Sequence, residues 1–159
     1  MDNIYKAAMR AADHALLTPW RFLCIRGPSL DKLGDLFVSA ATGADPTLSD
    51  AKLASIRLKP RRAPLIIVVI VKHQDHPKVP AIEMDLSAAA AAQNMLLAAH
   101  AQDLGGMWRT GSMAYSQTVK QGLGLANNEN ITGFLYLGSR SVPPRKLNQP
   151  LLTDYFVDW

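Results

Sequence analysis

Two short stretches of the sequence concentrate charged and aromatic side chains of the kinds that hold ligands. The first runs from Arg10 to His14 and is followed closely by Pro19-Trp20-Arg21-Phe22. We expect residues 2–14 to form one helix, since two N-capping residues precede an apolar repeat at helical spacing. Arg10 and His14, four residues apart, would then share a helix face and could address one ligand together.

The second stretch is Leu104-Gly105-Gly106-Met107-Trp108-Arg109-Thr110-Gly111. Its glycines would allow a ligand close to the backbone, while Trp108 could stack on a planar ring and Arg109 could hydrogen-bond to it. The two stretches together predict a site for an anion and an aromatic ring. The alternative is an ordinary turn with a surface arginine.

Two other clusters are better explained as solvated surface. His73 and His76 have the spacing of a metal pair, but they lie in a polar loop, and we expect no metal site. Lys59, Arg61 and Arg62 precede a strand and could contact phosphate or nucleic acid. We expect Lys59 and Arg62 to be solvated instead and to tolerate substitution.

Composition and missing motifs exclude several classes of protein. Apolar residues make up 48% of the 159 residues, so intrinsic disorder is excluded, and the net charge of +4 is too small to indicate a nucleic-acid partner. The chain has no GxSxG, P-loop, CxxC or GxGxxG motif, and we assign no catalytic side chain. Its one cysteine, Cys24, is expected to be buried in a strand. No secretory signal or membrane span is evident, so a cytoplasmic protein is expected.

The apolar pattern predicts alternating helices and strands in a single domain, residues 1–159. The uninterrupted β-branched run from Pro64 to Lys72 predicts a strand at the centre of a sheet, buried on both faces. Gly105 and Gly106 are expected to end the long helix in a left-handed cap. Helices are expected over 2–14, 29–41, 47–59, 81–102 and 116–122, and strands over 20–26, 64–72, 107–110 and 131–139.

Two apolar segments predict a homodimer. Between Leu86 and Ala101 the long helix has only four polar residues, so it needs burial nearly all round. The extended tail, residues 140–159, ends in Tyr155-Phe156-Val157-Asp158-Trp159 and should dock on its own sheet or on that of a partner.

Motifs in a specific order resemble the FMN-dependent nitroreductase family, and in particular its short, YdjA-like NAD(P)H nitroreductase subgroup. The resemblance covers about residues 5 to 140, and the combination of QNMLLAAHA with GGMWRTG is its most specific part. It is carried by AAMRAADHALLTPWRF, RAPLIIVVIVK, KVPAIEMDLSAAAAAQNMLLAAHAQDLGGMWRTG and ITGFLYLG.

The resemblance implies an α+β fold in which a central, mostly antiparallel sheet is flanked by helices and completed by the partner's C-terminal strand. It also implies two FMN molecules in a dimer interface. The residues matching FMN-contacting positions are Arg10, His14, Trp108, Arg109 and Thr110. A stretch matching the nicotinamide nucleotide segment comprises Ala98, Ala99, His100, Ala101, Gln102 and Asp103.

The implied function is a flavin-dependent oxidoreductase that passes electrons from NAD(P)H through FMN to nitro-aromatic or quinone-like acceptors. Family members carry, ahead of the matched region, a helix ending in Arg-Arg-Ser that binds the FMN phosphate, and this sequence contains no counterpart. The expectation is therefore weak FMN binding, and the alternative is a non-catalytic dimer with the nitroreductase fold. Nucleic acid and membrane are not expected partners.

Overall fold

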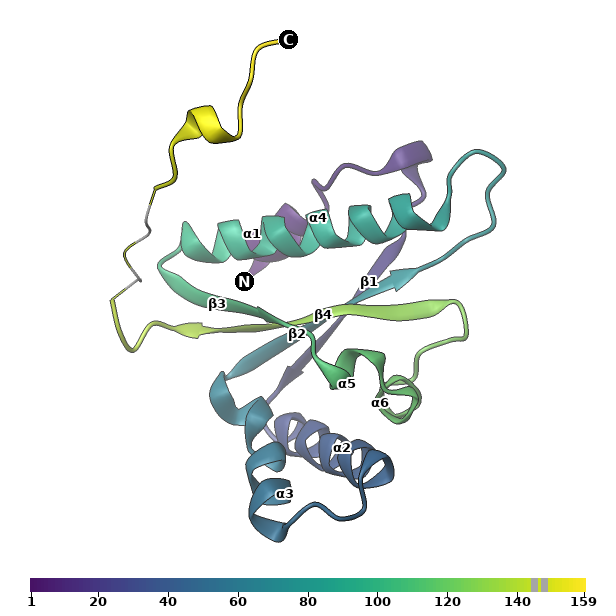
Figure 1. Ribbon diagram of the computed structural model, residues 1–159, viewed down its shortest axis with the longest axis vertical. Helices are drawn as coiled ribbons and strands as arrows, with labels where there is room; N and C mark the ends of the chain where they lie inside the picture. Colours follow the sequence, from purple (N-terminus) through teal and green to yellow (C-terminus); the bar gives the residue numbers. More distant parts are fainter. Residues whose placement is uncertain (144–145, 147–148) are drawn as a thin grey trace.

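The computed structural model describes residues 1–143, 146 and 149–159, and a four-stranded antiparallel sheet lies at its centre (Figure 1). The strand order is β1-β2-β4-β3, which leaves β1 and β3 as the edges. The strands are β1 Trp20–Arg26, β2 Leu65–Lys72, β3 Leu104–Arg109 and β4 Glu129–Ser139. The expected antiparallel sheet is confirmed.

β2 lies inside the sheet because its sequence leaves no polar face. All residues from Leu65 to Val71 are buried, and β2 pairs with β1 on one side and β4 on the other. The prediction of a central strand from this β-branched run is therefore confirmed. A β-bulge between Val69 and Ile70 places Thr132 opposite no residue of β2.

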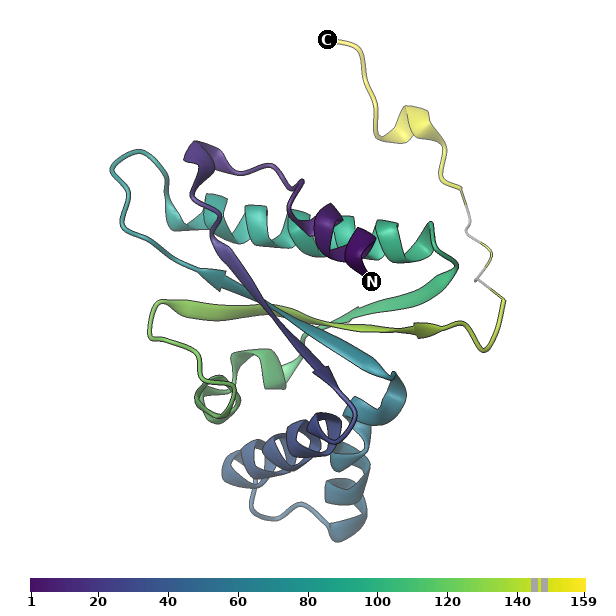
Figure 2. The same cartoon turned by 180° about the vertical axis from the view of Figure 1, so that it is seen from behind.

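Helices cover both faces of the sheet (Figures 1 and 2). One layer contains α1 and α4, and the other contains α2, α3, α5 and α6. Two apolar clusters under α1 and α4, and one under the opposite layer, form the core. The helices are α1 Asp2–Ala8, α2 Ser29–Ala44, α3 Asp50–Arg57, α4 Ala81–His100, α5 Ser112–Tyr115 and α6 Gln117–Gly122, with 3-10 turns η1 His14–Leu16, η2 Lys59–Arg62 and η3 Leu152–Asp154.

The connection from α4 to β3 differs from expectation. Gly105 and Gly106 were predicted to cap the helix, but they lie inside β3, and the residue with a positive φ (59°) is Asp103. Glycine suits this part of β3 because a Cβ on Gly106 would lie 2.8 Å from Cδ2 of Leu96 on α4. Close packing of the helix on the strand thus accounts for a glycine that sequence reasoning assigned to a turn.

Cys24 is exposed, and the prediction of a buried cysteine is wrong. The apolar neighbours of Cys24 in sequence belong to β1, an edge strand that pairs, among the described strands, only with β2. Its Sγ lies 3.5 Å from the hydroxyl of Tyr5. Apolar residues around a position indicate a strand, but they do not show whether the strand is central or at the edge.

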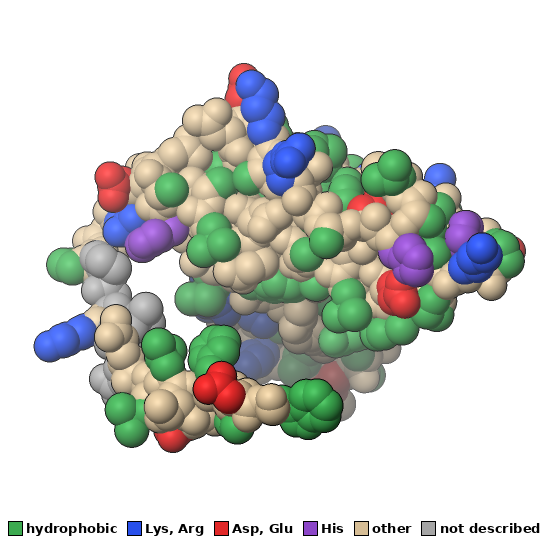
Figure 3. Space-filling view, turned by 90° about the horizontal axis from the view of Figure 1, so that it is seen from above, with side chains coloured by type: hydrophobic (Ala, Val, Ile, Leu, Met, Phe, Trp, Pro, Cys, Tyr) green, Lys and Arg blue, Asp and Glu red, His purple; other side chains and the backbone are tan. Residues whose placement is uncertain are grey.

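The face of α4 turned away from the sheet is apolar and exposed. Ile82, Leu86 and Leu97 each leave more than half of their surface open. Figure 3 looks onto the α1–α4 layer and shows hydrophobic side chains there and along the tail. In the part of the chain that the structure describes, no helix is long and apolar enough to cross a membrane.

Candidate functional site

β3 places Trp108 and Arg109 on opposite faces of the sheet, because successive side chains of a strand alternate. The Trp108 indole packs in the core beneath α4, and its Nε1 donates a hydrogen bond to the carbonyl oxygen of Thr132 at 3.3 Å. Arg109 lies on the α2 side, with its Cζ 5.7 Å from the centre of the Tyr136 ring. Arg109 is therefore available to a ligand on the α2 side, and Trp108 packs against the core on the opposite face of β3.

A cavity of 270 Å³ lies at the end of β3, on this α2 side. Three cationic side chains line it, from Lys59, Arg62 and Arg109, together with the hydroxyl residues Thr110 and Ser112. The lining includes no acidic residue, and within the described residues none of the three cations has an acidic partner within 4 Å. The cavity is thus electropositive and suited to an anionic ligand.

Lys59 and Arg62, which are expected to be solvated, also line the same cavity as Arg109. Arg62 is exposed and Lys59 is half-buried, yet both side chains border the cavity. The 3-10 turn η2, whose Pro60 is buried, turns this basic segment toward β3. Their position beside Arg109, about fifty residues away in sequence, could not be found from local pattern. The one available signal was a cluster of bases next to a proline.

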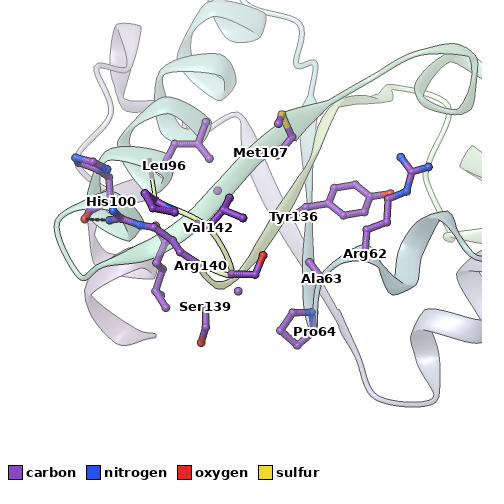
Figure 4. A pocket seen from close by; sticks show the side chains of 16 residues that line it. Arg62, Ala63, Pro64, Leu96, His100, Met107, Tyr136, Ser139, Arg140 and Val142 are labelled. Carbon is purple, nitrogen blue, oxygen red and sulfur yellow. Dashed lines mark hydrogen bonds between the residues drawn. The ribbon is translucent and has the colours of Figure 1, made fainter. Parts of the chain in front are cut away.

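Tyr136 on β4 forms a wall shared with a second cavity of 570 Å³ (Figure 4). Its side chain is 8% exposed, and this burial raises the pKa of the phenol, although the positive charges of Arg109 and Arg62 oppose the rise. The phenol is accordingly neutral at pH 7 and keeps its proton for donation. The two cavities share Arg62 and Tyr136 in their linings, so they adjoin one another, and together they are called the cleft. The larger one has the size of a small-molecule site.

Arg140 closes the far side of the larger cavity, near the C-terminal end of α4 (Figure 4). It donates hydrogen bonds to the carbonyl oxygens of Leu104 at 3.4 Å and His100 at 3.2 Å, and it contacts the carboxylate of Asp103 at 3.4 Å. The His100 carbonyl belongs to the last turn of α4, where carbonyls lack helical partners, and it also accepts a hydrogen bond from the backbone N–H of Asp103 at 3.0 Å. Arg140 therefore fixes the end of α4 against the sheet, and the His100 side chain borders the cavity beside it.

Gly111 gives the smaller cavity an open backbone wall. Its φ of 65° and ψ of −169° lie in a region that only glycine adopts readily, and no atom lies within 4 Å of the position of a Cβ there. A ligand can thus approach the backbone between Thr110 and Ser112 closely. The backbone at Gly111 is open, and its role toward a ligand stays a prediction.

Arg10 and His14 do not share a helix, because the helix predicted over 2–14 is confirmed only in its first half. α1 ends at Ala8, and Ala15, Leu16 and Thr18 have positive φ angles of 59°, 54° and 45°. The Asp13 carboxylate accepts a hydrogen bond from the backbone N–H of Thr18 at 2.6 Å. Such a side-chain bond competes with helical backbone bonding.

His14 instead contacts α4 through its Nδ1, which meets a carboxylate oxygen of Glu83. Arg10 is exposed two residues beyond the end of α1. Both residues therefore belong to the α1–α4 side of the sheet, whereas Arg109 and Thr110 belong to the α2 side (Figures 1 and 2). The two predicted halves of the ligand site lie on opposite sides of the sheet of one chain.

The stretch expected to meet the nicotinamide nucleotide ends α4. Ala99 is fully buried, and Gln102 donates a hydrogen bond to the Ala98 carbonyl oxygen at 2.8 Å. Ala101 and Asp103 are exposed in the turn beyond the helix, where Asp103 also contacts Arg140. Of the six residues in this stretch, only His100 lines a described cavity of the cleft. The nucleotide assignment stays a prediction.

The two histidines of the loop before α4 form hydrogen-bond contacts with neighbouring residues of the chain. His73 Nε2 lies 3.0 Å from Oδ1 of Asp85, and His76 Nδ1 accepts a hydrogen bond from the backbone N–H of Lys78 at 3.2 Å. Among the described residues, no three metal-ligating side chains are gathered in one place.

Comparison with known proteins identifies the family. Residues 1–139 match the Nitroreductase family. The chain belongs to the nitroreductase family. It is 38% identical over 139 residues to "Putative NAD(P)H nitroreductase YdjA" of Escherichia coli (strain K12), covering 87% of this chain and 75% of that protein. It is 31% identical to "Putative NAD(P)H nitroreductase" of Haemophilus influenzae, with the same coverage of each chain.

Solved structures show the nitroreductase fold. A nitroreductase-like family protein from Bacillus cereus superposes with a TM-score of 0.78 at 23% identity, covering 99% of this chain and 83% of that chain. A "putative nitroreductase in complex with fmn" from Desulfovibrio desulfuricans superposes with a TM-score of 0.73 at 24% identity, covering 99% of this chain and 82% of that chain. The α+β nitroreductase fold that the resemblance implies is therefore confirmed for this chain.

Proposed function

We propose that this nitroreductase-family protein is a flavin-dependent oxidoreductase that uses NAD(P)H to reduce nitro-aromatic or quinone-like acceptors through FMN. The observation that carries the proposal is the electropositive cleft at the end of β3. Lys59, Arg62 and Arg109 line it beside the open backbone at Gly111, and no acidic side chain among residues 1–143, 146 and 149–159 pairs with them.

The chemistry of this donor set fits FMN. FMN has an anionic phosphate and a planar ring with carbonyl oxygens, and these groups match cations, hydroxyls and free backbone amides. When bound, FMN supplies two-electron chemistry, taking hydride from NAD(P)H and returning electrons to the acceptor. The cations beside the ring would favour the reduced, more negatively charged flavin, since nearby charge tunes a cofactor's electronics.

The remaining residues of the predicted FMN set support a homodimer. His14 contacts Glu83 of α4, and Arg10 follows α1, whereas Arg109 and Thr110 line the cavity on the α2 side of the sheet. We therefore infer that one flavin meets these two pairs on different chains. A second copy could supply the missing half. The exposed apolar face of α4 lies on the same side as Arg10 and His14 and provides a surface for such a copy.

Direct titration tests the proposal. FMN is added to the wild type and to Arg10→Ala, Lys59→Ala, Arg62→Ala and Arg109→Ala, with flavin fluorescence as the readout and Lys78→Ala as an exposed cationic control. We expect each of the first four variants to weaken binding by about 1.5–3 kcal/mol, the range for a lost hydrogen bond to a charged group, and the control to match the wild type.

Activity is then measured as NAD(P)H oxidation with a nitro-aromatic or quinone acceptor. A protein that binds no FMN, or that binds it equally well in all variants, would contradict the proposal. That result would favour the alternative, a non-catalytic dimer with the nitroreductase fold.

A further inference from the structure

We propose that Glu83 is a positioning residue for His14, which it holds in one tautomer and one ring orientation so that the imidazole can meet FMN. This inference rests on the proposed function, because it takes His14 to contact the flavin bound by a second copy of the chain. The role belongs to Glu83 alone among the acidic residues of α4, since the other contact between a histidine and this helix joins Asp85 to His73.

The backbone around His14 does not by itself fix the side chain. His14 begins the three-residue turn η1, which contains Ala15 at φ 59° and is followed by Thr18 at φ 45°. A helix would hold its side chains through neighbours one turn away, but this segment has no such neighbours. A histidine that must present one nitrogen to a ligand therefore needs a partner from another element.

Glu83 supplies that partner from the first turn of α4. Its carboxylate meets Nδ1 of His14, 69 residues away in sequence, and the two side chains remain 40% and 52% exposed. α4 is a firm support, since Met84, next to Glu83, is 1% exposed in the core.

The rest of the segment is also tied to neighbouring elements. Gln74 donates a hydrogen bond to the Leu17 carbonyl oxygen at 3.0 Å, and Leu17 packs against the cluster that contains Met84. The segment that carries His14 thus remains attached to the molecule when Glu83 is replaced, and loss of this pair alone should not unfold it.

The pairing determines which ring nitrogen carries the proton. A carboxylate accepts hydrogen bonds and cannot donate them, so neutral His14 keeps its proton on Nδ1. Nε2 then remains free to accept a hydrogen bond from a ligand, or to donate one once the ring is protonated. Without Glu83 the ring could rotate, and the proton could move to Nε2.

The first test is a spectrum that needs no flavin. Ring ¹⁵N shifts of His14 are recorded by NMR at pH 8.5, well above the ordinary histidine pKa of about 6.5, in the wild type, Glu83→Gln and Glu83→Ala. We expect the Nδ1–H tautomer in the wild type and a large population of Nε2–H in Glu83→Ala. Glu83→Gln, whose amide oxygen can still accept from Nδ1, should lie between them. A wild-type ring mainly in the Nε2–H form would overturn the proposal.

The second test is FMN affinity. Glu83→Ala and His14→Ala should each weaken FMN binding about tenfold or more, the double variant should bind no worse than His14→Ala alone, and Glu83→Gln should recover part of the loss. Asp85→Ala, which removes the other histidine–carboxylate pair of α4, is the matched control and should change affinity less than twofold.

The outcomes separate this inference from the proposed function. Unchanged affinity in Glu83→Ala, with a loss in His14→Ala, would overturn the positioning role and leave the flavin proposal standing. Unchanged affinity in both variants, with the wild type binding FMN, would remove His14 from the flavin site and overturn the inference with it. A wild type that binds no FMN would overturn both.

Discussion

Arg21 on β1 and Glu129 at the start of β4 form a bidentate ion pair, with Nε to Oε1 at 2.7 Å and Nη2 to Oε2 at 2.6 Å. Glu129 is 6% exposed and also accepts a hydrogen bond from the backbone N–H of Ala126 at 3.0 Å. Arg21 donates a further bond to the carbonyl oxygen of Gly124 at 3.2 Å. The pair thus joins the edge strand β1 to the loop that leads into β4.

This ion pair should make the free energy of unfolding depend on pH in the acidic range. The hydrogen bond from Arg21 holds the pKa of Glu129 below its ordinary value, despite the opposing effect of burial. The stabilisation is therefore complete above the unfolded-state pKa of about 4.3 and is lost as the pH falls through the lower folded-state pKa. In Glu129→Gln, the free energy of unfolding measured with urea should fall less steeply between pH 5 and pH 3 than in the wild type.

The same variant should be less stable at pH 7 by about 2–3 kcal/mol. This value is below the 3–5 kcal/mol typical of a fully buried broken pair, because Arg21 keeps about a third of its side chain exposed. Asp31→Asn, which breaks an exposed pair with Arg61, is the control and should cost much less. Equal losses in the two variants would show that burial of Glu129 has no energetic effect.

Substitution of Gly133 is predicted to destabilise the fold because of Trp108. A Cβ on Gly133 would lie 2.0 Å from Nε1 of the Trp108 indole, so Gly133→Ala must displace a packed ring. We expect a loss of about 1–3 kcal/mol in the free energy of unfolding, with a change in Trp fluorescence. Gly43→Ala, in α2 with nothing within 4 Å of its Cβ position, should instead leave stability unchanged or raise it. If Gly133→Ala keeps the stability and the Trp fluorescence of the wild type, the Trp108 indole does not pack against Gly133.

The exposed face of α4 is predicted to be a dimer interface larger than the standard size of about 1,600 Å². Leu86→Asp should shift the protein from dimer to monomer in sedimentation equilibrium at micromolar concentration, since a charge would be buried at the contact. Leu58→Asp, at an equally exposed leucine on the α3 side, is the matched control and should remain dimeric. A monomeric wild type would contradict the prediction.

The C-terminal tail is predicted to dock on the partner subunit. Leu151, Leu152, Tyr155, Phe156 and Trp159 are all at least 69% exposed in a single chain, which is costly in water. Deleting residues 150–159 should lower the melting temperature and weaken the dimer. If mass and melting temperature stay the same after the deletion, the tail is a free end.

Local pattern predicted the main elements of the fold. The β-branched run of β2, the apolar face of α2 and the length of α4 each depend on residues close in sequence, and each was found where expected within a few residues. The helix expected over 116–122 is also present as α6, which Ser116 caps, its hydroxyl accepting a hydrogen bond from the N–H of Val119 at 3.4 Å. Such features are set by periodicity and by side-chain bonding to the adjacent backbone.

Which of the predicted residues lie together depends on the tertiary structure. The sequence, through its likeness to a family, indicated Arg10, His14 and residues 108–110, but it could not show that the first two lie across the sheet from Arg109. Nor could it show that Lys59 and Arg62, expected to be solvated, line one cavity with Arg109, because the turn η2 brings them there. The physical reason is that charge and backbone pattern act locally, while the faces that meet in a cleft depend on strand order and on where each helix ends.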